Sequence, residues 1–100
     1  MDTELLNRLV RRIVDKAQPE KIILFGSAAR GDTTDDSDLD LFVVKGGVHR
    51  RRLAMDLYEE IADLGVAVDI IVVTPEDIER YGDSPGLVLE PALREGKVVY

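Results

Sequence analysis

The sequence predicts an α/β or α+β fold in which a small mixed β-sheet of three to four strands is covered by helices. Three observations predict this class. Apolar residues recur at helical spacing near the start of the chain, short runs rich in Leu, Ile and Val follow, and Gly or Pro separates the two kinds of segment. With 100 residues, 45% hydrophobic and 33% charged, the chain is predicted to form one compact domain over residues 1–100.

The first part of the chain is predicted to hold one helix and two strands. Thr3 is placed to cap the helix and Pro19 ends it. Residues 21–25 and 39–44 have the composition of short buried strands, with a polar loop before the second. The apolar stripe that predicts the helix consists of Leu5, Leu6, Leu9, Val10, Ile13, Val14 and Ala17.

A second helix and a third strand follow. Gly46 and Gly47 separate the second strand from this helix, and Gly65 is predicted to end it. Residues 66–73 are rich in β-branched side chains and predict the third strand. The apolar stripe of the second helix is Leu53, Leu57, Ile61 and Leu64.

The end of the chain carries weaker signals. Thr74 is a candidate N-cap, with proline at the first helical position and acids in the first turn, for a short helix to about Tyr81. Pro85 and Pro91 bracket a possible further helix, and residues 97–100 are compatible with an edge strand.

Composition excludes several classes of protein. Twenty acidic and 13 basic residues give a net charge of −7, which opposes binding to duplex nucleic acid. The absence of cysteine excludes disulfides, thiolate zinc sites and cysteine nucleophiles. The start of the chain shows no targeting signal, and no apolar run approaches the ~20 residues that a membrane helix needs. We therefore expect a cytoplasmic protein without direct nucleic-acid or membrane binding.

Three aspartates carry the strongest chemical signal. Asp38 and Asp40 stand two apart in a strand-forming segment, so their side chains are expected on one face. Asp69 lies inside an apolar strand, where a buried carboxylate needs a partner. If the two strands are neighbours, the three carboxylates converge, and a hard divalent cation such as Mg²⁺ best relieves their repulsion.

A turn upstream completes this constellation. Gly26 and Ser27 end a strand and precede small residues that can open a helical turn, which would aim backbone N–H groups and a hydroxyl at a phosphate. A phosphate cradle beside metal-binding carboxylates suits two-metal phosphoryl or nucleotidyl transfer.

Each part also has a plainer interpretation. The acidic cluster that includes Asp38 and Asp40 can be a solvated turn, and Asp69 can be a buried carboxylate paired with an arginine. His49 and the arginines after it are expected to form a solvated helix start, with a contact to phosphate or to a partner as the alternative. Tyr58 and Tyr81 are expected to pack with their hydroxyls in water.

The spacing of these residues resembles the polymerase-β-like nucleotidyltransferases. Gly26-Ser27, ten residues, Asp38-Leu39-Asp40 and then Asp69 in a following strand are similar to the motif of its small prokaryotic branch, the minimal nucleotidyltransferases. The resemblance implies a palm-like sheet in which three aspartates are catalytic and hold two Mg²⁺ ions while ATP binds nearby. The implied metal ligands are Asp38, Asp40 and Asp69, and the implied nucleotide-binding residues are Gly26, Ser27, Arg30 and Ser37.

The resemblance also implies a partner. Such domains are commonly paired with a HEPN ribonuclease toxin and act as antitoxins, some by transferring AMP from ATP to a tyrosine of the toxin with release of pyrophosphate. Because the sequence suggests no acceptor-binding domain, we expect the partner to supply the acceptor site in a hetero-oligomer. Two alternatives remain open: an antitoxin that neutralises the toxin by binding alone, and a nucleotidyltransferase subunit acting on a small molecule or tRNA.

Overall fold

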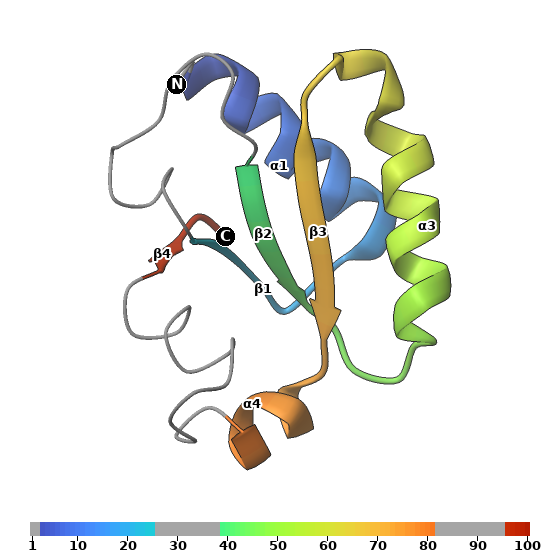
Figure 1. The fold of residues 1–100 in the computed structure, drawn as a ribbon, viewed down its shortest axis with the longest axis vertical. Coiled ribbons are helices and arrows are strands. Elements are labelled where there is room, and N and C mark those ends of the chain that lie inside the picture. Colours follow the sequence, from blue (N-terminus) through green and yellow to red (C-terminus); the bar gives the residue numbers. More distant parts are fainter. Residues whose placement is uncertain (1–2, 26–38, 82–95) are drawn as a thin grey trace.

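The computed structural model describes residues 3–25, 39–81 and 96–100, and its elements are arranged as shown in Figure 1. The helices and strands agree closely with those predicted. In chain order they are α1 (Thr3–Ala17), β1 (Lys21–Phe25), β2 (Leu39–Val44), α3 (Arg50–Ile61), a 3-10 turn (Ala62–Leu64), β3 (Val68–Val73), α4 (Pro75–Tyr81) and β4 (Lys97–Val98).

The strands form one mixed four-stranded sheet in the order β3-β2-β1-β4. β1 is antiparallel to both β2 and β4, whereas β2 and β3 run parallel. The third strand starts at Val68, two residues later than predicted, and the edge strand predicted over 97–100 is confirmed at its first two residues. The predicted fold class is therefore confirmed.

Helices α1 and α3 cover one face of this sheet, as Figure 1 shows. The parallel connection from β2 through α3 to β3 places α3 there. Leu9, Ile13 and Leu57 are fully buried between the layers. The remaining buried members of this main core are Ala17, Ile22, Leu24, Leu39, Leu41, Val43, Ile61, Ile70 and Val72.

The opposite face of the sheet carries a second, smaller apolar cluster. It consists of Ile23, Phe42, Val44 and Val73, with Ile78 of α4 packed against it. Since side chains alternate along a strand, the even-numbered and odd-numbered residues of each strand face different sides. α4 follows the carboxyl end of β3, so it reaches only that end of the second face (Figure 1).

Local interactions define where the elements end. Gly65 ends the 3-10 turn after α3 with a φ of 66°, a left-handed conformation that favours glycine, as predicted. Thr74 Oγ1 accepts a hydrogen bond from the Asp77 N–H at 3.0 Å, which confirms the predicted cap of α4. Among the helices described, none is long and apolar enough to cross a membrane.

An ionic contact ties the two covering helices together. Arg12 of α1 donates to both carboxylate oxygens of Asp63, at 3.0 and 2.8 Å, and to the Glu60 carbonyl at 3.0 Å. The hydrogen bonds from Arg12 hold the pKa of the Asp63 carboxyl below its ordinary value.

Candidate active site

Asp40 and Asp69 lie side by side on the face of the sheet that α1 and α3 leave uncovered. β2 and β3 pair with Asp40 directly opposite Asp69, so both side chains project from the same face. Neighbouring strands are about 4.8 Å apart, which sets the separation of the two backbones. The predicted juxtaposition of the Asp40 and Asp69 strands is thus present in the fold.

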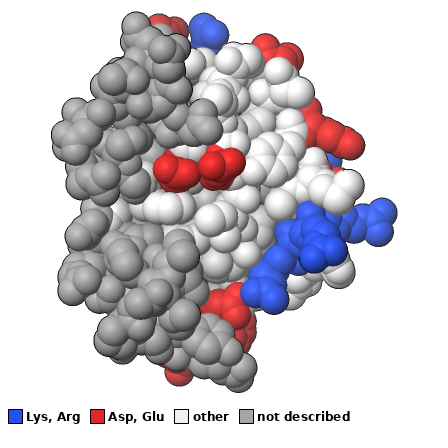
Figure 2. All heavy atoms as spheres, viewed as in Figure 1, with Lys and Arg blue, Asp and Glu red and all other residues white. Residues whose placement is uncertain are grey.

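The surroundings of this pair are apolar. Phe25 of β1 is the register partner of Asp40, and its ring stacks on Phe42 with the centroids 4.4 Å apart and the planes 12° from parallel. Figure 2 shows a small acidic patch on an otherwise uncharged part of this face, next to the residues drawn in grey. The two carboxylates therefore lie next to the stacked rings of Phe25 and Phe42.

The expectation that Asp69 is buried was wrong. Its side chain is exposed, and no buried polar or charged side chain occurs in the described ranges. The reason is the position of β3. It is an edge strand, and none of the described helices covers Asp69, so an apolar run can carry a solvated carboxylate. No ion pair joins Asp69 to a described basic residue, which argues against the arginine-paired interpretation.

The chemistry of the donor set fits a hard cation. Like charges placed opposite each other on paired strands repel, and a divalent ion with oxygen ligands converts that repulsion into attraction. Within residues 3–25, 39–81 and 96–100 no group of three or more potential ligands gathers, so Asp40 and Asp69 form a pair there. Asp38, the third predicted ligand, lies outside the described residues.

The predicted nucleotide-binding residues also lie outside the described part of the chain. These are Gly26, Ser27, Arg30 and Ser37, together with the turn and polar loop predicted around them. The possible helix between Pro85 and Pro91 has the same status. Their assignment remains a prediction from the sequence.

Comparison with known proteins decides the family. The polymerase beta nucleotidyltransferase family matches residues 7–100. This chain belongs to that family. The resemblance inferred from the spacing of the glycine, serine and aspartates is therefore confirmed at family level.

Solved structures agree with the family assignment. A provisionally named minimal nucleotidyltransferase is 35% identical, with 97% of this chain and 95% of that chain covered and a TM-score of 0.60. A provisionally named nucleotidyltransferase from Sulfolobus solfataricus is 26% identical, with coverages of 77% and 70% and a TM-score of 0.53. A chain in a crystal structure of a toxin-antitoxin with AMP-PNP is 22% identical, with coverages of 100% and 73% and a TM-score of 0.64, and shares the fold.

One curated relative carries a more specific name. A protein of Methanocaldococcus jannaschii, provisionally named a protein adenylyltransferase, is 29% identical over 99 residues. The match covers 85% of this chain and 66% of the relative, so this chain spans just under two thirds of the relative's length.

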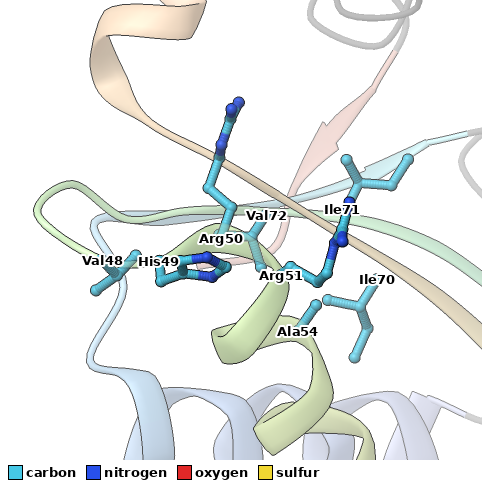
Figure 3. Close-up of a pocket in the computed structure, with 8 residues that line it drawn as sticks. All are labelled: Val48, His49, Arg50, Arg51, Ala54, Ile70, Ile71 and Val72. Carbon is cyan, nitrogen blue, oxygen red and sulfur yellow. The ribbon is translucent and has the colours of Figure 1, made fainter.

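The start of α3, near the face of the sheet that carries Asp40 and Asp69, is positively charged. His49 caps the helix, its Nδ1 accepting from the Arg52 N–H at 3.2 Å, and Arg50 pairs with Asp77 at 2.9 Å. The prediction of a wholly solvated helix start therefore missed two specific contacts. A hollow of about 760 Å³ opens between these residues and β3 (Figure 3).

Tyr58 has a structural role that the sequence did not reveal. Its hydroxyl accepts a hydrogen bond from the Ile70 N–H at 2.8 Å, so it is bonded to the outer edge of β3 rather than to water alone. The ring is 41% exposed. The only signal in the sequence was a tyrosine on the helix that precedes the edge strand.

Proposed function

We propose that this chain is a Mg²⁺-dependent nucleotidyltransferase that transfers AMP from ATP to a tyrosine of a HEPN ribonuclease toxin and thereby acts as its antitoxin. The observation that carries the proposal is the direct pairing of Asp40 with Asp69 on the open face of a nucleotidyltransferase sheet. The name of the M. jannaschii relative supports a protein as the acceptor. The shared fold with a chain of a toxin-antitoxin supports a toxin as that protein.

The metal would be held by Asp40 and Asp69, together with Asp38 from the sequence motif. Magnesium bound there would neutralise charge on the triphosphate and increase the reactivity of the attacking hydroxyl. The two described carboxylates suit this role because they are oxygen donors on a rigid β-ladder, with Leu41 and Ile70 anchoring the strands in the core beneath them.

The reaction is a substitution at the α-phosphorus of ATP. The tyrosine hydroxyl oxygen bonds to that phosphorus, the bond to the oxygen that bridges to the β-phosphate breaks, pyrophosphate leaves, and the hydroxyl proton is released. This chain contributes orientation. The paired strands fix the positions of the two carboxylates, which lowers the entropic cost of bringing the nucleotide and the acceptor together. We place this reaction in the cytoplasm, where ATP is available.

The exposure of this face supports a protein as the acceptor. Asp69 is exposed and Ile71, two residues along the same face, is 39% exposed, so a partner surface has access to the carboxylates. An acceptor presented by a folded partner is already oriented, which compensates for the small binding surface of this chain.

The test is transfer of label. The purified chain is incubated with Mg²⁺, α-labelled ATP and the product of the neighbouring gene as the candidate HEPN partner, and the partner is analysed by gel and intact mass. We expect a mass increase of one or more AMP units, loss of transfer in Asp69→Asn, and normal transfer in Asp15→Asn, a matched change at an exposed aspartate of α1. Transfer that survives in Asp69→Asn would contradict the proposal.

The same experiment separates the alternative antitoxin mechanism. If the complex forms, the ribonuclease is inhibited and no label is transferred, the chain neutralises by binding alone. In that case Asp69→Asn would inhibit the toxin as well as the parent chain does.

A further inference from the structure

We propose that the outer edge of β3 from Ile70 to Val72, with Arg51 of α3 beside it, is a docking groove for an extended acidic segment of a partner protein. Among the strands that the structure describes, β3 ends the sheet, so one side of its backbone is not paired with any of them. We call this stretch the β3 groove.

The hydrogen bonds to β2 identify which backbone groups face outward. Leu39 donates to the Ala67 carbonyl at 3.0 Å and Lys45 donates to the Val73 carbonyl at 2.9 Å. Since successive residues of a strand direct their backbone groups to opposite sides, the odd-numbered residues of β3 bond to β2. The N–H and C=O groups of Ile70 and Val72 consequently point away from the sheet.

Both ends of this outer edge are closed by side chains. The Ile70 N–H donates to the Tyr58 hydroxyl at 2.8 Å, and the Thr74 N–H donates to Asp77 Oδ2 at 3.0 Å. Between them lie the Ile70 C=O and the N–H and C=O of Val72, to which no residue in the described ranges donates or accepts. One donor and two acceptors at strand spacing match the backbone of an extended peptide.

The groove has room for such a peptide. A hollow of about 760 Å³ lies over this edge, with side chains from the start of α3 on one side and from β3 on the other (Figure 3). Ile71 of β3 is 39% exposed there. Arg51 and Ala54 of α3 line the hollow together with Ile71 of β3, so both basic and apolar side chains border the groove.

The charge of the groove selects an acidic occupant. His49, Arg50 and Arg51 line the hollow, although the chain carries a net charge of −7. No acidic residue is among the described residues that line the hollow, and the carboxylate of Asp77, which closes one end of the edge, is paired with Arg50. Figure 2 shows Lys and Arg side chains gathered on the same face as the central acidic patch, with uncharged atoms between them. Arg50 already pairs with Asp77, whereas Arg51 forms no ion pair with any described residue and is exposed. Arg51 is thus available to a carboxylate of the partner.

Other occupants fit less well. A second copy that paired its own β3 edge here would bring the Arg51 side chains of both copies close together, and like charges repel. A nucleic acid would place phosphate oxygens against the Ile70 and Val72 carbonyls, which are acceptors and cannot bind them. A peptide backbone satisfies both the donor and the acceptors.

The groove lies close to Asp69, so a docked partner could also be the acceptor of the proposed reaction. This part of the inference rests on the proposed function. Asp69 immediately precedes Ile70, so a segment paired with the edge passes within about 7 Å of Asp69 along the strand direction. A partner held in this way would present its acceptor hydroxyl beside the carboxylates.

The test is an NMR titration of the full chain, labelled with ¹⁵N and without ATP or Mg²⁺. The probe is a synthetic peptide of alternating glutamate and valine, and the control is the same peptide with lysine in place of glutamate. We expect saturable shifts of the Ile71 and Val72 amides with the acidic peptide alone. Arg51→Glu should raise the dissociation constant roughly fivefold or more. Arg51→Lys should bind nearly as the parent chain does, and Arg8→Glu, on α1, is the matched control.

Three results would overturn the proposal: no shift at millimolar peptide, equal shifts with both peptides, or a dissociation constant that Arg51→Glu leaves unchanged. Concentration-dependent shifts of the same amides without peptide would assign the groove to a second copy instead. The peptide titration contains neither ATP nor Mg²⁺, so failure of label transfer and failure of docking are separate outcomes.

Discussion

Asp40 of β2 and Asp69 of β3 are register partners on the open face of the sheet. Their pairing is a cost to the fold, because like charges placed opposite each other on neighbouring strands repel. Nothing in the described part of the apolar core needs carboxylates at these positions. A divalent cation held between the two carboxylates, as proposed above, would offset this repulsion.

Removing one of the two charges should show how much their repulsion destabilises the fold. Without divalent metal, we expect Asp69→Asn to raise the free energy of unfolding by about 0.5 kcal/mol, since the repulsion disappears. Magnesium at ten times its dissociation constant should stabilise the parent chain by about 1.4 kcal/mol and leave Asp69→Asn almost unchanged. Thermal unfolding followed by circular dichroism, with and without Mg²⁺, measures both effects. Asp15→Asn should respond to Mg²⁺ as the parent chain does, and a Mg²⁺ response retained by Asp69→Asn would refute the assignment.

Tyr58 should be important to the edge strand. Tyr58→Phe leaves the Ile70 N–H without its partner, and we expect a loss of about 1 kcal/mol in stability. Hydrogen exchange of the Ile70 amide should accelerate relative to other amides of β3. Tyr100→Phe, at a 51% exposed tyrosine, is the control and should alter neither quantity. Unchanged exchange at Ile70 would show that the hydroxyl does not hold this edge.

The stability that Asp77 contributes at the junction between β3 and α4 should depend on pH. The Thr74 N–H and hydroxyl, followed by Arg50, lower the pKa of the Asp77 carboxyl. A lowered pKa means that ionised Asp77 stabilises the fold above its unfolded-state pKa, and this contribution is lost as pH falls through the lower folded-state pKa. Urea unfolding should thus find the parent chain more stable than Asp77→Asn above about pH 5, with the difference shrinking toward about pH 3. A difference that stays constant over this range would exclude the ionised carboxylate as its source.

The α3 helix offers a test of how the two layers are held together. Leu57 is fully buried between the helices and the sheet, so Leu57→Ala should cost about 2–5 kcal/mol in unfolding free energy. Met55, two residues away, is 59% exposed, and Met55→Ala should cost no more than about 0.5 kcal/mol. Chemical denaturation of both variants provides the comparison, and similar losses would mean that α3 is packed differently from the description above.

Most of the elements were predictable because each has a local cause. The apolar spacing from Leu5 to Ala17, the β-branched run before Thr74 and the glycine at position 65 act within a few residues. The wrong expectation, a buried Asp69, arose because burial depends on which strand occupies the sheet edge. An apolar run looks the same whether one or both of its faces are covered.

For the candidate site, the sequence by itself determined the residue types: the aspartates, their spacing and the family motif around Gly26 and Ser27. Only the tertiary structure decided that Asp40 stands opposite Asp69, that Tyr58 and Asp77 close the outer edge of β3, and that Arg51 borders the groove between them. The reason is physical. Strand pairing, edge position and contacts between helix and sheet join residues far apart in the chain, and these contacts depend on how the whole apolar core packs.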